Sequence, residues 1–148
     1  MGMTKITIRK AQVTDAARLA KLSEVLGYPV EPELMKRRLE RLLSRPDHVV
    51  LVAESQTDGV VGWIHAVEQD ILEIGRSCEI LGLVVAADQR GHGVGRRLVE
   101  WVERWAFERG LKQLSVRSNV ARAESHPFYE RLGYTRVKTQ HAYWKHMR

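Results

Sequence analysis

The spacing of hydrophobic side chains changes several times along the chain, and each change predicts a new element. Lys5–Arg9 alternates between polar and apolar side chains, which is typical of a half-buried strand. From Ala16 to Leu26 the apolar residues recur at helical spacing and stop at Gly27, a residue type that often ends helices. A second helical pattern begins at Pro32 and runs through Leu43. The first third of the chain therefore predicts one strand followed by two helices.

The middle of the chain predicts three consecutive strands. His48–Glu54 and Val60–Val67 lie on either side of Thr57–Gly59, which has the residue types of a hairpin turn. The apolar run Cys78–Val85 predicts the next strand. Gly82 interrupts that strand and suits a β-bulge, because glycine offers no side chain for packing in a regular strand.

The last third predicts two helices and three strands. In chain order they are a helix over Gly93–Arg109, a strand over Leu114–Ser118, a short helix from Ser125, and a terminal hairpin of Tyr134–Thr139 and Ala142–His146. The whole order, βααβββαβαββ, predicts an α/β fold in which helices cover a mixed sheet. With no linker or internal repeat, residues 1–148 are expected to form a single domain.

A glycine-rich stretch, Arg90–Gly95, lies between the strand Cys78–Val85 and the helix that follows it. Glycines let backbone N–H groups approach a ligand, and the start of a helix leaves four N–H groups unpaired. The stretch therefore predicts a phosphate or pyrophosphate site. It matches neither a Walker A loop, since Arg96-Arg97 stands where Lys-Ser would be, nor the spacing of the dinucleotide fingerprint. A glycine-rich turn without a ligand is the alternative interpretation.

Composition places the chain among ordinary globular proteins. Of its 148 residues, 44% are hydrophobic and 28% are charged, and no apolar run approaches the roughly 18 residues of a membrane-spanning helix. The N-terminus lacks the apolar core of a signal peptide, and the single cysteine, Cys78, excludes an internal disulfide. We therefore expect a cytoplasmic protein without a membrane partner. The histidines do not have metal-ligand spacing, so no metal is expected.

The net charge of +6 has two interpretations. It is either a solvated basic surface or an attraction for an anionic ligand. Nucleic acid is the rival partner, but the chain contains no recognisable nucleic-acid motif, and we expect no such partner. A basic rim suits a ligand that carries several phosphates.

A second motif follows the predicted strand at Leu114–Ser118. Asn119 ends that strand, and Ser125–Tyr134 contains the pattern Phe-Tyr-Glu-x-x-Gly-Tyr. Together with Arg90-x-x-Gly93-x-Gly95, this order of motifs resembles the GNAT superfamily, the Gcn5-related N-acetyltransferases. The resemblance covers nearly the whole chain. It implies the GNAT fold, in which the fourth and fifth strands splay apart and hold acetyl-CoA as the cosubstrate.

The resemblance also implies which residues contact the coenzyme. The backbone of the fourth strand pairs with the pantetheine arm, the glycine-rich loop holds the pyrophosphate, and the second motif approaches the sulfur. Carried over to this chain, these residues are Leu83, Val84, Val85, Arg90, Gly91, His92, Gly93, Val94, Gly95, Arg96, Asn119, His126 and Tyr129.

Acetyl transfer to an amine needs a base and an acid. At a reference pKa of about 10.4, only about one alkyl amine in a thousand is neutral at pH 7, and the leaving thiolate needs a proton or a hydrogen bond. Glu79 precedes Val85 by six residues and matches the base position of the family's histone-acetylating members. Tyr129 matches the tyrosine that points at the coenzyme sulfur in the family. A surface ion pair for Glu79 and helix packing for Tyr129 are the alternatives.

The acceptor is the part of the function that the sequence defines least. The runs around Glu79 and Tyr129 look similar to aminoalkylphosphonate N-acetyltransferases and to small aminoglycoside-modifying relatives, although Gly82 departs from the acidic residue expected in the former. The expected function is transfer of an acetyl group from acetyl-CoA to a primary amine of a small molecule, by a homodimer. The alternatives are acetylation of a protein or peptide amine, and a catalytically silent coenzyme-A-binding regulatory module.

Overall fold

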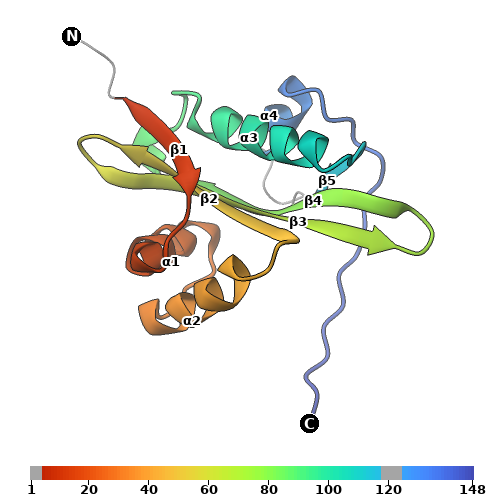
Figure 1. The fold of residues 1–148 in the computed structure, drawn as a ribbon, viewed down its shortest axis with the longest axis horizontal. Coiled ribbons are helices and arrows are strands. Elements are labelled where there is room, and N and C mark those ends of the chain that lie inside the picture. The colour runs from red at the N-terminus through yellow and green to blue at the C-terminus, as the bar shows by residue number, and fades with distance from the viewer. Residues whose placement is uncertain (1–4, 118–124) are drawn as a thin grey trace. The chain divides into compact units, whose positions relative to one another are not determined.

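A five-stranded mixed sheet, in the order β1-β2-β3-β4-β5, forms the centre of the computed structural model, which describes residues 5–117 and 125–148 (Figure 1). Four strands pair with antiparallel neighbours, and the last strand runs parallel to the fourth. Their bounds are β1 (Ile6–Lys10), β2 (His48–Ser55), β3 (Gly59–Ile71), β4 (Gly75–Val85) and β5 (Leu114–Val116). The described residues fall into two compact units, which divide between Val116 and Arg117.

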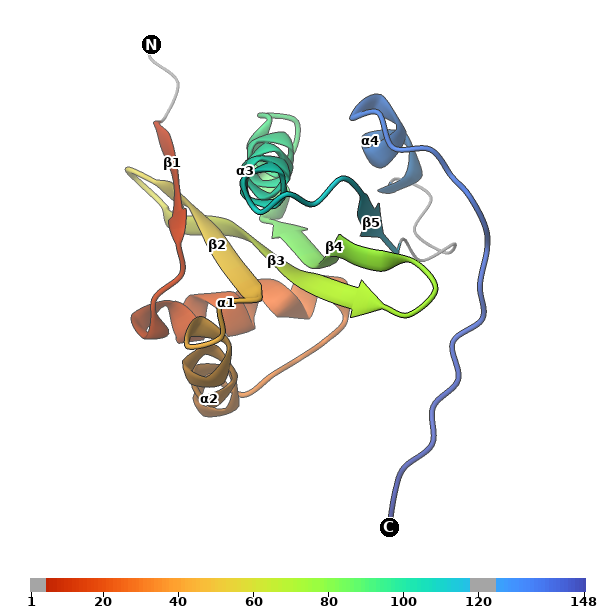
Figure 2. The same ribbon diagram turned by 45° about the vertical axis from the view of Figure 1, so that its right-hand side comes forward.

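Helices cover both faces of the sheet within the first unit. α1 (Ala16–Ser23) and α2 (Pro32–Leu43) pack on one face, and α3 (Val94–Glu108) packs on the other (Figure 2). Short 3-10 turns, η1 (Val13–Asp15), η2 (Glu24–Leu26) and η3 (Ala87–Gln89), join these elements. None of the helices in the described residues is both long and apolar enough to cross a bilayer.

The core lies between α3 and the central strands. Leu51 of β2, Ile64 of β3 and Leu98 of α3 have no exposed surface. Burying each such side chain stabilises the fold by about 1.5–3 kcal/mol before the cost of ordering the chain is counted. Because helices cover both faces, β2 is a nearly continuous apolar run rather than an alternating one.

The fourth strand contains the bulge that Gly82 suggested. In the pairing of β3 with β4, His65 pairs with Gly82 and the next residue, Ala66, pairs with Ile80, so Leu81 is the extra residue. A Cβ on Gly82 would lie 2.8 and 2.9 Å from two ring carbons of Trp63, so the indole ring occupies the space of a side chain at this position. The bulge is confirmed, and the neighbouring ring of Trp63 explains why the residue after Leu81 is glycine.

Residues between the predicted strands Val60–Val67 and Cys78–Val85, which the sequence left without an assignment, extend both strands. β3 continues to Ile71 and β4 begins at Gly75, so the two strands form a long hairpin. Leu72 and Ile74 at its tip are exposed, which explains why no pattern of buried positions marked it as strand.

The second unit contains α4 (Ser125–Arg131), the short helix expected from Ser125. The element order is confirmed as far as α4, and the α/β fold class is confirmed. The terminal hairpin of Tyr134–Thr139 and Ala142–His146 is wrong, because residues 134–148 form no helix or strand. Val137 and Trp144 are 84% and 93% exposed, so the apolar residues that suggested strands are not buried against a neighbour. Alternation produces a strand only where another strand accepts its backbone hydrogen bonds.

Candidate active site

The glycine-rich loop turns sharply between the end of β4 and the start of α3. Gly91 and Gly93 have φ angles of 83° and 78°, a region that side chains with a Cβ rarely adopt. A Cβ on either glycine would meet nothing within 4 Å, so the loop presents its backbone to open space. Val94 is only 2% exposed and fixes the first turn of α3 in the core. Burial of Val94 thus anchors the end of the loop in the core, while the backbone at Gly91 and Gly93 is accessible to a ligand.

The first turn of α3 has the charge and hydrogen-bond donors of an anion site. The first backbone N–H groups of a helix have no intrahelical acceptor. Gly93, the N-cap of α3, has no side chain that could accept hydrogen bonds from them. Arg90 and Arg96 are exposed, and Arg96 lies 3.6 Å from Glu100 in a weak surface pair. Arg97 donates through Nη1 to the carbonyl of Ile6 at 2.7 Å, which ties the helix to β1. Arg90 and Arg96 therefore remain for a bound anion.

The β4 strand is open on the side of β5 beyond the bulge. β5 pairs with β4 only at Cys78, Glu79 and Ile80, and within the described residues no strand pairs with that edge from Leu81 onward. The side chains of this segment pack against the rest of the unit, since Leu83 and Val85 are half-buried and Val84 is 3% exposed. The backbone edge on the β5 side is not paired with a strand in the described residues. After this open edge the chain passes through η3 into the glycine-rich loop.

Glu79 lies where β4 and β5 part. It pairs with Val67 of β3 and with Ser115 of β5, and only Ile80 follows it in the β4–β5 pairing. The residue is 9% exposed, so its carboxyl group is shielded from bulk water. Glu79, the open edge at Leu83–Val85 and the loop Arg90–Arg96 thus follow one another along the chain within the first unit.

Tyr129 belongs to α4 in the second unit. Its ring makes edge contacts with Phe128 and Tyr134, at centroid distances of 5.0 and 5.9 Å. Burial raises the pKa of Tyr129 to about 12, so the phenol stays protonated across the physiological range. Two further predicted residues are not described in full. Asn119 is outside the described residues, and His126 belongs to α4 with a side chain that is not described.

Sequence reasoning missed a pair of histidines on β2 and β3. Nδ1 of His48 and Nε2 of His65 are 2.9 Å apart, and the two rings are stacked with centroids 5.1 Å apart. The only signal in the sequence is one histidine inside the otherwise apolar strand Val60–Val67, a pattern that more often reflects packing. Among the described residues, no three His, Cys, Asp or Glu side chains gather as metal ligands would.

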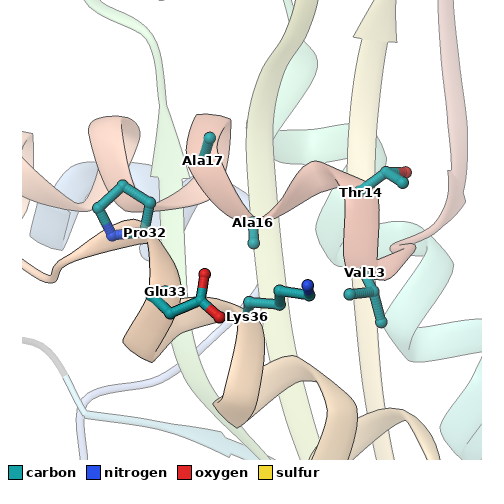
Figure 3. Close-up of a pocket in the computed structure, with 7 residues that line it drawn as sticks. All are labelled: Val13, Thr14, Ala16, Ala17, Pro32, Glu33 and Lys36. Carbon is teal, nitrogen blue, oxygen red and sulfur yellow. The ribbon is translucent and has the colours of Figure 1, made fainter.

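A shallow cavity of about 280 Å³ lies among η1, α1 and α2, on the face of the sheet opposite α3 (Figure 3). Its lining is mostly apolar, with the charged groups of Glu33 and Lys36 from the first turns of α2. None of the predicted site residues lines it. The complete lining is Val13, Thr14, Ala16, Ala17, Pro32, Glu33 and Lys36.

Comparison with known proteins identifies the class to which this fold and loop belong. The family model described as "Acetyltransferase (GNAT) family" matches residues 15–134, which is most of the chain. The chain therefore belongs to the GNAT family and is an N-acetyltransferase by class.

Individual relatives agree with that assignment. An uncharacterized N-acetyltransferase of Chlorobaculum tepidum is 25% identical over 134 residues, which cover 90% of this chain and 78% of the relative. An aminoalkylphosphonate N-acetyltransferase of Salmonella typhimurium is 38% identical over 56 residues, 38% of this chain and 36% of the relative. The chain thus matches about a third of that relative's length.

The solved structures extend the likeness to the whole fold. An aminoglycoside N-acetyltransferase in complex with CoA superimposes with a TM-score of 0.87 at 17% identity, over 99% of this chain and 98% of the other. At this identity the superposition establishes a shared fold.

Proposed function

We propose that this protein transfers the acetyl group of acetyl-CoA to a primary amine of a small molecule, by direct attack of the amine on the thioester. The observation that carries the proposal is the continuity of the open β4 edge with the anion site at the start of α3. Within the described residues no strand pairs with the edge of β4 beyond Ile80, and after η3 the chain continues into a loop that exposes backbone N–H groups and two arginines. An extended arm that ends in a pyrophosphate fits such a surface.

The residues present fit coenzyme A. The backbone of Leu83–Val85 would pair with the amides of the pantetheine arm, and the loop Arg90–Gly95 with Arg96 would hold the pyrophosphate. Open space around Gly91 and Gly93 permits the close approach that a phosphate needs. When bound, acetyl-CoA supplies an activated acyl group with a thiol as leaving group. His126 and Asn119 are proposed as further contacts to the coenzyme on the strength of the family motif.

Glu79 is proposed as the group that removes a proton from the acceptor amine. It lies at the divergence of β4 and β5 and is nearly buried. A carboxylate placed there takes up a proton directly or through one water, which keeps the amine in the neutral form that attacks.

Tyr129 is proposed as the donor to the leaving sulfur. Its pKa of about 12 lies well above the ordinary thiol value of about 8.5, so complete transfer of its proton to a thiolate is uphill. The phenol therefore acts mainly by donating a hydrogen bond to the developing negative charge, which is strongest in the transition state.

A thiol-release assay with acetyl-CoA and a panel of amines tests the proposal. The panel holds aminophosphonates, amino sugars, aminoglycosides, polyamines, amino acids and peptides. Turnover of a small amine, together with thermal stabilisation by CoA and not by ATP, is the expected result. Stabilisation by ATP alone would overturn the proposal.

Two other outcomes identify the alternatives. Tight coenzyme binding without turnover of any amine would identify a silent coenzyme-binding module. Turnover of peptides alone would identify acetylation of protein amines. Salt-sensitive binding to RNA or DNA would contradict the proposed absence of a nucleic-acid partner.

The proposal also covers the assembly of the protein. We infer one catalytic domain over residues 1–148, acting as a homodimer in the cytoplasm. Light scattering coupled to size exclusion distinguishes a dimer from a monomer, and a monomer at working concentration would overturn that part without affecting the proposed chemistry.

A further inference from the structure

The sheet face toward α1 and α2 carries polar side chains next to the β4 bulge. A Cβ on Gly62 would lie 3.4 and 3.5 Å from Val94 and Leu98 of α3, so Gly62 faces α3. Successive residues of a strand point to opposite faces. Trp63 and His65 therefore point to the opposite face of the sheet from Gly62. α1 and α2 cover that face, and α3 covers the other (Figures 1 and 2).

Two more titratable groups share that face. Val67 pairs with His48 on one side and with Glu79 on the other, while His65 pairs with Gly82. His65 is thus a diagonal neighbour of both His48 and Glu79, a separation that long side chains bridge. Glu79, Val67 and His48 form a row across β4, β3 and β2, and His65 lies beside this row on the same face.

The two histidines are joined directly. The 2.9 Å separation of His48 Nδ1 and His65 Nε2 is a hydrogen bond in which one ring donates and the other accepts. Two neutral imidazoles bonded in this way leave one outward lone pair and one outward N–H. A proton taken up at one end therefore releases another proton at the other end.

The surroundings keep both rings neutral before the relay operates. Burial, reinforced by repulsion from His48, lowers the pKa of His65 to about 4. Burial also lowers the pKa of His48, on which Asp47 and Arg45 act in opposite directions. His48 is half-buried and begins β2, two residues after the exposed Pro46, and so forms the end of the row nearest to solvent.

Acetylation of an amine at neutral pH must release a proton to solvent. An alkylammonium loses two protons when it becomes an amide; one leaves with the thiol, and the other needs an exit. We propose that His65 and His48 are this exit, a relay that carries the amine's proton from Glu79 to solvent. This inference rests on the proposed function. It states where the proton that Glu79 takes from the amine goes next, through two residues that the family motifs do not include.

The transfer conserves protons and charge. The amine nitrogen bonds to the acyl carbon, the carbon–sulfur bond breaks, and the sulfur leaves with its electron pair and one proton. Glu79 takes the second proton and passes it to Nδ1 of His65. His65 gives the proton on Nε2 to Nδ1 of His48, and His48 releases the proton on its own Nε2 to water. Proton exchange with water restores the starting tautomers.

The relay is tested with His65→Asn, His48→Asn and the double variant, using the best amine of the panel. Each single variant should lower kcat by about tenfold, most at low pH where solvent bases that replace the relay are scarce. The double variant should be no slower than the worse single variant, because residues in series fail together. The affinity for CoA should not change.

Val50→Ala is the matched control, because Val50 is the β2 partner of His65 and carries no proton. It should leave kcat and its pH profile unchanged. Multiplying losses in the double variant, or full kcat in both single variants, would overturn the relay. If His65→Asn does not fold, wild-type kcat in His48→Asn overturns it. A wild-type protein that turns over no amine overturns the proposed function instead, and the relay with it.

Discussion

Gly93 is central to the proposed anion site. Its φ of 78° and the open space beside it mean that a side chain there costs little packing but strains the backbone by about 1–3 kcal/mol. The same side chain stands where a phosphate must approach the backbone. Gly110, at the other end of α3, has a φ of 77° and equally open surroundings, so it separates these two effects.

Gly93→Glu should lower the affinity for acetyl-CoA by at least about tenfold, because the carboxylate repels the pyrophosphate and blocks the N–H groups. Gly110→Glu should cost similar stability and leave the affinity intact. Isothermal calorimetry with CoA measures both. Equal affinity in a folded Gly93→Glu protein would place the phosphate site elsewhere.

Tyr129 illustrates how one oxygen can be tested without disturbing packing. Tyr129→Phe keeps the ring that contacts Phe128 and Tyr134. If the hydroxyl stabilises the leaving sulfur, kcat should fall by roughly ten- to a thousandfold while the affinity for CoA changes little. Steady-state kinetics with Tyr143→Phe, whose ring is 91% exposed, provides the control. Full turnover in Tyr129→Phe would assign the ring to packing alone.

At the scale of elements, the turn from β1 into α1 is held by a network of charged groups. Arg9 donates to both carboxylate oxygens of Asp15, at 3.0 and 2.9 Å, and the backbone N–H of Gln12 donates to Asp15 at 2.7 Å. Arg9 also donates to Glu54 on β2 at 3.0 Å. The network thus joins the first strand, the first helix and the sheet. Burial would raise the pKa of Asp15, but the hydrogen bonds from Arg9 and Gln12 outweigh it and hold the pKa below its ordinary value.

Asp15→Asn should therefore destabilise the protein by about 2–3 kcal/mol, since it leaves Arg9 without its bidentate partner. Urea unfolding at pH 7 measures the loss. Asp58→Asn is the control, because that exposed carboxylate accepts only one long hydrogen bond, from Gln89 at 3.4 Å. A loss for Asp15→Asn no larger than for Asp58→Asn would show that the network contributes little.

At the scale of the whole molecule, the half-buried His65 makes stability depend on pH. The pKa of His65 falls from 6.5 to about 4 on folding, so between these values the unfolded chain binds a proton that the folded chain does not. Stability is complete above pH 6.5 and declines as the pH falls toward 4. The depressed pKa of Asp15 adds a further loss at lower pH, where its carboxylate is protonated.

Denaturant unfolding at pH 7.5 and pH 5 should show a decrease of about 2 kcal/mol that depends on His65. His65→Asn should flatten this part of the profile, whereas His141→Asn, at an exposed position, should leave it unchanged. A wild-type protein as stable at pH 5 as at pH 7.5 would contradict the assignment.

The sequence by itself determined the elements up to α4, the glycine-rich turn before α3 and the family. These depend on short-range rules: apolar spacing marks helices and strands, and glycines at fixed positions allow the positive φ angles of the loop. The bulge at Gly82 was also predictable, because a lone glycine in an apolar strand has few other uses. The role of Trp63 in filling the space beside it was not.

Only the tertiary structure decided which distant residues meet. The hydrogen bond between His48 and His65 depends on the register of two strands, and the place of Glu79 in the same row depends on a third. The predicted terminal hairpin is wrong because it lacks such a pairing. Tyr134–Thr139 has strand-like alternation, but no strand pairs with it in the structure described. Hydrophobic pattern specifies what a segment can form, whereas pairing and burial between segments far apart in the chain specify what it does form.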